Sequence, residues 1–341
     1  MEIKTFEGKF RDIGRQEGKI YKKNGLTLDW GSIKDESRLL AGQLKVYEKY
    51  YPEMLEEVKG IAEGGGFNEE KAIYNFITSE IFWYTDRFSL KRECTIFGVR
   101  NKNGFFVGRN YDWHPAIEKL WEIYKVKSPG LYPLIAVTDM ATAPKKDAVK
   151  TFYYADDAIN SKGLFIGLTF AYNDKWSFGI SNLHMCRFIA ERCKNVKEAI
   201  GVFKEVPICC SKNYFIADKE GNMAVVEHSS RKFKVLEPQN GVLIQTNHYI
   251  DPGLAKEDTV LKNAPSHNTF LRYYETLQKI NLIKETFSFP DIVKILGFKS
   301  YIYQNSPDIK TIWSLGLDMK NRDYKICWNL QKEKKEKILK I

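Results

Sequence analysis

The sequence lacks the long apolar segments that anchor proteins in membranes. Its 341 residues contain no apolar run of about 18 residues, the length that a membrane-spanning helix needs. The opening stretch, Met1–Lys9, has no apolar core like that of a secretory signal, so we expect no signal peptide. Both absences predict a chain without a membrane span.

Cysteine is scarce, and its spacing excludes the common zinc and disulfide frameworks. No two pairs of cysteines stand at zinc-site spacing, and the adjacent Cys209 and Cys210 cannot easily bridge each other. Cys186 and Cys193 lie on one face of a predicted helix, a spacing typical of packing. We therefore expect reduced thiols and a cytoplasmic protein. The six cysteines are at positions 94, 186, 193, 209, 210 and 327.

Other signatures of metal and cofactor chemistry are also missing. The five histidines include no His-x-x-x-His pair, and none stands at metal-ligand spacing from a cysteine. The chain has neither the Gly-x-Ser-x-Gly elbow of a serine hydrolase nor a phosphate-binding loop. We therefore predict no metal and no organic cofactor.

Apolar and basic side chains are what the chain has in quantity. Hydrophobic residues make up 43% and aromatic residues 14%, enough for the core of one large domain or two smaller ones. The net charge is +10, but lysines are interleaved with glutamates throughout, so we predict no nucleic-acid binding. A cationic surface also suits an anionic substrate or a lipid headgroup, and composition does not choose between them. The most charged run, from Gln331 on, alternates in sign and is expected to be a solvated tail.

The first 93 residues are predicted to be mainly helical. Apolar residues recur at three- and four-residue steps from Glu36 to Glu63, which indicates a helix pair that breaks near Pro52 and ends at Gly64–Gly66. Asn68 then has the side chain of an N-cap for a further helix. The composition changes just before Cys94, where a strand-rich region begins.

The remainder of the chain predicts two strand-rich blocks separated by helices. Such an order suits an α+β fold in which two stacked antiparallel sheets are covered by helices on both faces. The predicted strands are 122–127, 133–138, 151–155, 163–170, 177–181, 213–217, 222–227, 231–236, 241–246, 311–318 and 324–329. The predicted helices are 184–204, 266–283 and 289–297.

The stretch Cys94–Trp113 carries the residues with the most reactive side chains. Two apolar runs flank a turn that ends in Asn103-Gly104, and Asn-Gly favours the positive φ angles of a tight hairpin turn. Because a hairpin folds back on itself, we expect Arg109 and Asp112 to return close to the thiol of Cys94. A nucleophile would then lie beside a cation and a carboxylate. Taken alone, the same residues are also typical of a small buried cysteine and a solvated ion pair.

The order of these residues resembles a known family of enzymes. Cys94-Thr95, followed about fifteen residues later by Gly-Arg-Asn-Tyr-Asp ending at Asp112, resembles the start of the mature chain in cysteine N-terminal-nucleophile hydrolases. The nearest resemblance is to the acyl-coenzyme A:6-aminopenicillanic acid acyltransferase-like family (peptidase family C45), relatives of penicillin V acylase, bile salt hydrolase and acid ceramidase. It covers nearly the whole chain. It implies a four-layer αββα sandwich with a helical N-terminal segment.

Segments on both sides of the hairpin extend the resemblance. Gly8–Gly18 is similar to the family's glycine-spaced opening, although its own chemistry favours a turn into a short helix, without the strand that a phosphate loop needs. Gly163–Thr169 resembles a family strand. Some relatives have Asn where this chain has Thr169, so an oxyanion role there would fall to a backbone N–H. Thr169 and Phe170 are thus expected to line the oxyanion or substrate site.

Two later segments supply the remaining candidate residues. Asn247 follows an apolar strand and resembles the family's Thr-Asn step, whose amide helps to form the oxyanion hole; an ordinary turn is the alternative. Thr269 and Arg272 match the family's Ser/Thr-x-x-Arg, whose Arg supports the site or holds an acidic group. Asn268 stands where an acidic residue is expected. A helix-surface Arg is the alternative for Arg272.

The resemblance implies that the chain cuts itself between Glu93 and Cys94. Residues 1–93 would then be a propeptide or α-chain, and residues 94–341 the catalytic β-chain. The freed α-amine, with an ordinary pKa near ~8, would serve as base for the thiol of the same residue, which an internal amide nitrogen cannot do. The precursor would therefore be a zymogen.

The predicted reaction is hydrolysis of a linear, non-peptide amide bond through an acyl-enzyme on Cys94. Arg109 would favour the thiolate, Asp112 would orient the amine, and Asn247 with a backbone N–H would hold the oxyanion. The predicted partner is a small-molecule N-acyl amide. The processed chains are expected to self-associate, and a homo-oligomer is the further expectation.

Three alternatives remain open at this point. If an amine intercepts the acyl-enzyme, the same site is an N-acyltransferase. A papain-like pair would join the cysteine to His248 instead. A non-enzymatic basic binding protein would use Cys94 only as a structural residue, and it predicts neither self-cleavage nor selective thiol labelling.

Overall fold

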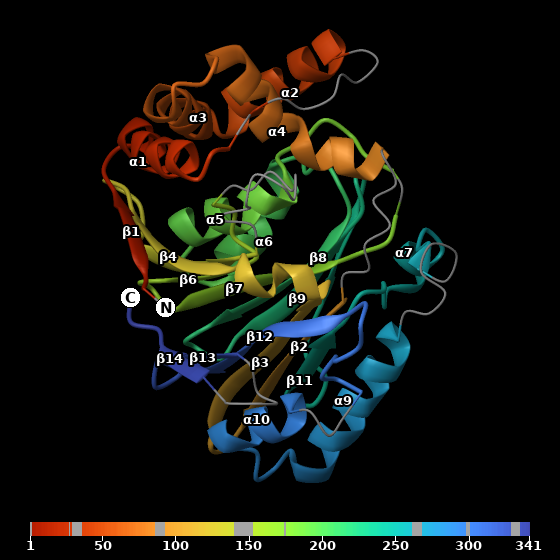
Figure 1. Ribbon diagram of the computed structural model, residues 1–341. Helices are drawn as coiled ribbons and strands as arrows, with labels where there is room; N and C mark the ends of the chain where they lie inside the picture. The colour runs from red at the N-terminus through yellow and green to blue at the C-terminus, as the bar shows by residue number, and fades with distance from the viewer. Residues whose placement is uncertain are drawn as a thin grey trace.

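Two stacked β-sheets form the centre of the computed structural model (Figure 1). It describes residues 2–26, 28, 36–85, 93–139, 153–173, 175–260, 268–297, 301–328 and 335–341. The larger sheet has the strand order β1-β4-β5-β6-β7-β8-β9-β10, and the smaller has the order β11-β2-β3-β12-β13-β14. Neighbouring strands are antiparallel except for the pair β1 and β4. The α+β sandwich expected from the sequence is confirmed.

The chain visits each sheet twice: β1 lies in the larger sheet, β2 and β3 in the smaller, β4 to β10 in the larger, and β11 to β14 in the smaller. The strands are β1 (Lys4–Glu7), β2 (Glu93–Asn101), β3 (Gly104–Trp113), β4 (Glu122–Lys127), β5 (Leu134–Thr138), β6 (Asp157–Asn160), β7 (Leu164–Phe170), β8 (Lys212–Asp218), β9 (Met223–His228), β10 (Phe233–Leu236), β11 (Val242–Gln245), β12 (Lys310–Asp318), β13 (Asp323–Trp328) and β14 (Lys335–Ile338). The helices are α1 (Phe10–Lys23), α2 (Glu36–Tyr50), α3 (Pro52–Gly65), α4 (Glu69–Thr85), the 3-10 helix η1 (Pro115–Lys119), α5 (Asn182–Arg192), α6 (Val196–Glu205), α7 (Pro252–Ala255), α9 (Thr269–Ile283) and α10 (Phe289–Leu296).

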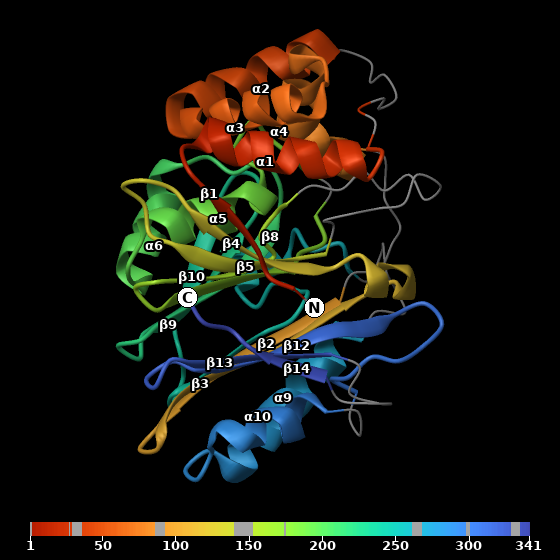
Figure 2. The ribbon, with the colours of Figure 1, turned by 60° about the vertical axis from the view of Figure 1, so that its left-hand side comes forward.

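Helices cover both outer faces of the sandwich. α1 to α6 lie on the side of the larger sheet, whereas α9 and α10 lie under the smaller sheet (Figure 2). Among the described residues, the three largest apolar clusters follow these layers, and Cys94 belongs to the one between the sheets. Representative buried residues are Val58, Ile166 and Ile189 in the first core, Ile96, Phe165 and Trp313 in the second, and Phe97, Ile280 and Ile295 in the third.

Helices α1 and α3 cross at very short range because each carries two glycines four residues apart. A β-carbon added at Gly14 or Gly18 would lie 1.9 or 2.3 Å from a backbone oxygen of α3. One added at Gly60 or Gly64 would lie 2.1 or 2.3 Å from a backbone oxygen of α1. These distances leave no room for any side chain. Gly8–Gly18 therefore provides a turn and a packing helix, as its own chemistry predicts.

The N-terminal segment also contributes a strand to the larger sheet. β1 pairs in parallel with β4, with Lys4 opposite Tyr124, and Figure 2 shows it running from α1 along the sheet edge. Phe6 is 2% exposed and packs edge-on against Tyr153, with 4.8 Å between the ring centroids. The sequence does not signal this strand, because only one of its four residues is buried.

The β2–β3 hairpin closes one residue earlier than predicted. Its loop is Lys102–Asn103, and Gly104 is the first residue of β3, opposite Asn101. The Asn101 Oδ1 atom accepts hydrogen bonds from the N–H groups of Asn103, at 2.9 Å, and Gly104, at 3.2 Å. A turn closed by this side chain does not need a positive φ at Asn103.

Two predicted strands are wrong. Residues 153–155 precede the strand of this region, since β6 begins only at Asp157, and residues 151 and 152 lie outside the described residues. The segment 177–181 forms a single isolated bridge, between Ile180 and Ile208. In both places short apolar runs pack under the sheet as loops rather than joining it.

A predicted helix and the predicted tail also need correction. The helix over 184–204 is two helices, α5 and α6, because Asn195 caps α6 by accepting the Glu198 N–H at 2.9 Å. The charged C-terminal run contains an edge strand, β14, that pairs with β13. Alternating charges suit such an edge, because they stay in water and oppose pairing with other chains.

Among the described residues, no helix has both the length and the apolarity to cross a bilayer. All six cysteines are buried and free of disulfides. The cytoplasmic location stays a prediction.

Candidate active site

Asn247 reaches Cys94 because β11 ends at Gln245, before it reaches the first residues of β2. In this pair Gln245 lies opposite Ile96, so continuing the register by two residues places Asn247 opposite Cys94. β11 has ended there, and the Asn247 side chain replaces the missing backbone partner: its Oδ1 accepts the Cys94 backbone N–H at 2.7 Å. The strand end thereby delivers an amide group to the cysteine.

Arg109 fixes the thiol side of Cys94. Tyr111 lies opposite Cys94 in β3 and Arg109 is two residues away, so these side chains project into the space between the sheets. The buried guanidinium has its Nη2 3.9 Å from the Cys94 Sγ, donates from Nη1 to the Leu168 carbonyl at 2.8 Å, and has its Nε 2.7 Å from Asp157 Oδ2. Three different partners thus fix its orientation.

Burial controls the ionisation of the Cys94 thiol. Its side chain lies in the core between the sheets, and this burial raises its pKa to about 12. The charge of Arg109 is the largest opposing influence, that of Arg272 is a smaller one, and the charge of Asp112 raises the pKa further. In the uncut chain the thiol is therefore protonated at neutral pH. Attack needs a base or a change in the surroundings.

Asp112 lies on the other face of the same hairpin. It pairs with Glu93, the residue before Cys94, so its side chain projects toward the layer of α9 and α10 rather than toward the thiol. Its Oδ1 accepts the Thr311 hydroxyl at 2.6 Å, whereas its buried Oδ2 has no hydrogen-bond partner among the described residues. Burial raises the pKa of Asp112 to about 7, although Arg272 and Thr311 oppose this. The hairpin brings the Asp112 side chain to the peptide bond before Cys94, while a hydrogen bond from the Asp112 backbone lowers the pKa of the thiol.

Arg272 joins the backbone of Cys94 to helix α9. It is fully buried, donates to the Cys94 carbonyl oxygen, and donates to Asn247 Oδ1 at 2.9 Å. Its Nε donates to Asn268 Oδ1 at 2.6 Å and lies 3.4 Å from the Glu93 carboxylate. Asn268 is therefore a hydrogen-bond partner of Arg272, and the carboxylate that the motif lacks comes from Glu93. Arg272 is not a surface residue.

Thr169 and Phe170 end β7 at the same corner of the site. The Thr169 hydroxyl donates to the Thr246 carbonyl at 2.6 Å, and Asn247 Nδ2 donates to the Phe170 carbonyl at 3.0 Å. Thr169 thus fixes the end of β11. Asn247 Nδ2 is a donor for which a substrate oxygen could compete with Phe170.

His248 occupies a separate hydrogen-bonded corner. Its Nδ1 lies 2.9 Å from Thr269 Oγ1 and 3.1 Å from Thr246 Oγ1, and its ring packs against Phe270 with 4.2 Å between centroids. Burial lowers its pKa to about 4. The ring nitrogen Nδ1 therefore belongs to the threonine pair, which argues against a papain-like partner for Cys94.

Asp157 is the site residue that sequence reasoning missed. Besides its contact with Arg109, its Oδ2 accepts the Trp313 indole N–H at 3.1 Å. Burial raises its pKa to about 6, while the charge of Arg109 opposes this. The available signal was an acidic residue directly before the apolar pair Ala158-Ile159. The predicted strand 151–155 ends before Asp157, whereas β6 begins at Asp157, so the prediction left this residue outside a strand.

Comparison with known proteins identifies the family. A family model described as acyl-coenzyme A:6-aminopenicillanic acid acyl-transferase matches residues 99–333. The chain belongs to this family. The description of this family is that of an acyl-transferring enzyme. A search of curated proteins gave no match.

Solved structures agree on the fold of this acyl-transferase family member. A mutant of conjugated bile acid hydrolase from Clostridium perfringens is 14% identical, with a TM-score of 0.52 over 72% of this chain and 92% of that chain. A second variant of the same hydrolase is 14% identical, with a TM-score of 0.52 over 73% and 97%. Penicillin V acylase from Agrobacterium tumefaciens is 15% identical, with a TM-score of 0.47 over 72% and 86%. At such identities the first two matches show the shared fold alone.

Proposed function

We propose that this protein is a self-processing cysteine N-terminal-nucleophile amidohydrolase that cleaves linear, non-peptide amide bonds. One observation carries the proposal: three different buried side chains hold the three polar groups of Cys94. Asn247 accepts its N–H, Arg272 donates to its carbonyl oxygen, and Arg109 lies 3.9 Å from its sulfur. Any buried residue needs partners for its backbone N–H and carbonyl. A structural cysteine needs no cation beside its sulfur, whereas a nucleophile that is also a cleavage site uses all three contacts.

Self-cleavage breaks the peptide bond before Cys94. The thiol attacks the carbonyl carbon of Glu93, a thioester forms as the C–N bond breaks, and the thiol proton passes to the departing nitrogen. Asn247 Oδ1 already accepts the hydrogen of that nitrogen and holds it in place. Water then hydrolyses the thioester, which leaves a carboxylate on Glu93 and a free amine on Cys94.

Departure of Glu93 completes the mature site. The new α-amine, with an ordinary pKa near ~8, accepts the thiol proton at neutral pH. It arises beside Asp112, whose Oδ2 accepts no hydrogen bond from the described residues, and Asp112 orients it. Arg109 favours the thiolate. Asn247 Nδ2 exchanges the Phe170 carbonyl for the oxyanion of the substrate.

Residues 1–93 stay bound after the cut as an α-chain in this proposal. Their contacts with the β-chain, 94–341, include buried charged groups: Glu57 pairs with Arg187 at 2.5 Å, and the Tyr51 hydroxyl donates to Glu191 at 2.9 Å. Separating these groups would leave buried charges unpaired, which is costly. The two processed chains therefore remain associated. A homo-oligomer stays a prediction.

The substrate class in this proposal is a small-molecule N-acyl amide. Water releases the acyl group from Cys94 in the hydrolase. The description of the matching family favours a second acceptor: an amine that takes the acyl group first makes the same site an N-acyltransferase. Conjugated bile acids and acylated 6-aminopenicillanic acid are therefore the first compounds to screen, each with and without an added amine acceptor.

The intact mass of the purified chain under denaturing conditions tests the proposal. The parent should give two fragments, the smaller of about 11 kDa, which is 93/341 of 39.6 kDa. Cys94→Ala should give one chain, and Cys327→Ala, which removes another buried thiol, should be cut like the parent. A haloacetamide should label Cys94 selectively. A single uncut parent chain with an unreactive Cys94 would leave only the basic binding protein.

A further inference from the structure

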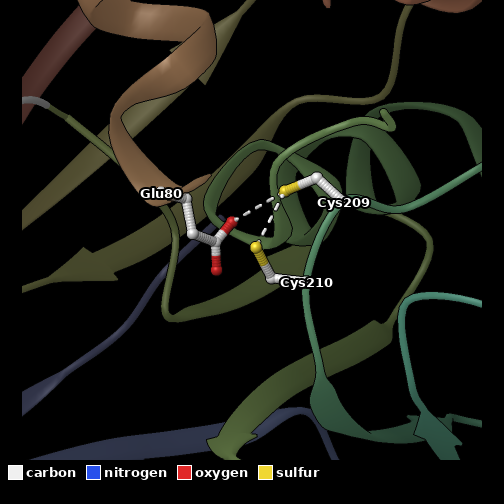
Figure 3. A group of neighbouring side chains, drawn as sticks. All are labelled: Glu80, Cys209 and Cys210. Carbon is white, nitrogen blue, oxygen red and sulfur yellow. Dashed lines mark hydrogen bonds between the residues drawn. The ribbon is translucent and has the colours of Figure 1, made fainter. Parts of the chain in front are cut away.

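A second group of reactive side chains lies where the N-terminal segment meets the body. Glu80 comes from α4, and Cys209 and Cys210 come from the loop before β8 (Figure 3). All three side chains are buried, and one ligand atom of each lies within 4.8 Å of the others. The two Sγ atoms are 3.4 Å apart, and Cys209 Sγ is 3.6 Å from Glu80 Oε2.

We propose that Glu80, Cys209 and Cys210 bind a thiophilic divalent cation of the zinc class. With metal–sulfur bonds of about 2.3 Å and metal–oxygen bonds of about 2.1 Å, tetrahedral geometry separates sulfur from oxygen by about 3.6 Å and the two sulfurs by about 3.8 Å. The observed separations are 3.6 and 3.4 Å, so small side-chain rotations admit the cation. Two thiolates and one carboxylate suit zinc better than harder cations.

The charge of the cluster stays balanced when a cation binds. Lys212 Nζ lies 3.1 Å from Glu80 Oε1, so without a cation the group holds one ammonium, one carboxylate and two neutral thiols. A divalent cation displaces the two thiol protons, forms two metal–sulfur bonds and adds no net charge. A buried site that is neutral in both states avoids the large cost of an unpaired buried charge.

Glu80 is already oriented toward the sulfurs. Its Oε2 accepts the Ser181 hydroxyl and the Asn182 backbone N–H, each at 2.7 Å, and its Oε1 accepts the Asn182 side-chain amide at 2.9 Å. Cys209 completes the set as a thiol donor to Oε2. The cation takes the place of that thiol proton between sulfur and oxygen, while the other donors keep the carboxylate fixed.

A cation here would join residues 1–93 to the body through metal–ligand bonds. Glu80 lies before the proposed cleavage site, and both cysteines lie after it. The ligands come together only in the folded chain, so binding adds to its stability. The site itself does not depend on self-cleavage.

Metal content of the full-length Cys94→Ala chain tests this site apart from the proposed function, because the proposed nucleophile is absent. The chain is produced with added Zn²⁺ or with Co²⁺ as a spectroscopic probe, and dialysed. We expect about one bound cation per chain and sulfur-to-cobalt charge-transfer absorption. The bound cation and the absorption should each fall at least tenfold in the double variant Cys209→Ser/Cys210→Ser and in the single variant Cys210→Ser. Neither should fall in Cys193→Ser, which changes a buried cysteine outside the cluster.

Two results would overturn the site. A Cys94→Ala chain that retains neither Zn²⁺ nor Co²⁺ would show that the cluster is only a hydrogen-bonded core. Retention of the cation by folded cysteine variants, with circular dichroism like that of the parent, would place it elsewhere. If the double variant fails to fold, the cobalt spectrum of the parent decides, because absent charge-transfer absorption excludes sulfur ligands.

Discussion

The two faces of the β2–β3 hairpin differ at Cys94. On the thiol face, one cation meets one carboxylate: Arg109 pairs with Asp157, and its other nitrogens contact Leu168 and the sulfur. On the opposite face, the guanidinium of Arg272 lies 3.4 Å from Glu93, and its charge also lowers the pKa of Asp112. The first face is balanced in the uncut chain. The second is not.

The face of Arg272 and Asp112 is the one next to the peptide bond that we propose is cut. Burial and the neighbouring Glu93 both raise the pKa of Asp112, to about 7, while Arg272 only partly opposes them. Removal of Glu93 takes one acid away and brings an amine in its place. Once Glu93 has moved away, the amine would therefore lower the pKa of Asp112, which Glu93 raises in the uncut chain.

Removing Arg272 should produce the largest loss. In the uncut Cys94→Ala chain, Arg272→Gln removes the guanidinium that lies 3.4 Å from the buried Glu93 carboxylate and should lower the free energy of unfolding by about 3–5 kcal/mol. Arg15→Gln, at ion pairs whose arginine side chain is 46% exposed, should cost about 1 kcal/mol or less. Urea unfolding measures both. Equal losses would show that the face around Arg272 is no more strained than the surface.

The two acidic residues should differ in how pH changes stability. Each pKa is raised on folding, so each carboxyl favours the folded state below its unfolded pKa, about 3.9, and this contribution is lost as pH rises through the folded value. That value is about 7 for Asp112 and about 6 for Asp157.

The corresponding experiment is urea unfolding of the Cys94→Ala chain between pH 4 and 8. Asp112→Asn should remove a fall in stability that extends to about pH 7, and Asp157→Asn one that ends near pH 6. Asp308→Asn, at an exposed position, is the control and should leave the pH profile unchanged. Coincident profiles for the first two variants would contradict the difference between the faces.

Loss of the Thr311 hydroxyl should have the smallest effect. This hydroxyl donates to Asp112 Oδ1 at 2.6 Å and stabilises the carboxylate. Thr311→Val should cost about 1 kcal/mol and move the upper end of the Asp112 transition to higher pH, whereas Thr311→Ser should keep the parent profile. The same pH series measures both variants. A shift to lower pH in Thr311→Val would disprove the role of this hydrogen bond.

Periodicity and turn chemistry predict much of the fold, because they report local structure. The break at Pro52, the N-cap at Asn68 and the hairpin after Cys94 all follow from neighbouring residues. Pairing between distant segments does not. β1 is too short to show a period. β14 has the sequence of a charged tail, and only its pairing with β13 makes it a strand.

The same limit applies to the site. Side chains alternate between the two faces of a strand, so Arg109 and Asp112, three residues apart, lie on opposite faces. The prediction that both approach the thiol did not take this alternation into account. Asp157 and Thr311 come from other strands, so no local pattern could bring them to Arg109 and Asp112.

Strand β1 gives the N-terminal segment a second attachment, far along the chain from Glu93. While the peptide bond at Glu93 is intact, this strand docks at the high effective concentration that a covalent tether provides. After a cut, the same ladder between β1 and β4 joins two molecules, and β1 stays in place because the rest of the α-chain remains bound through its other contacts. In a cleaved enzyme, one edge strand of the larger sheet would thus belong to a second molecule, which is not so in the precursor.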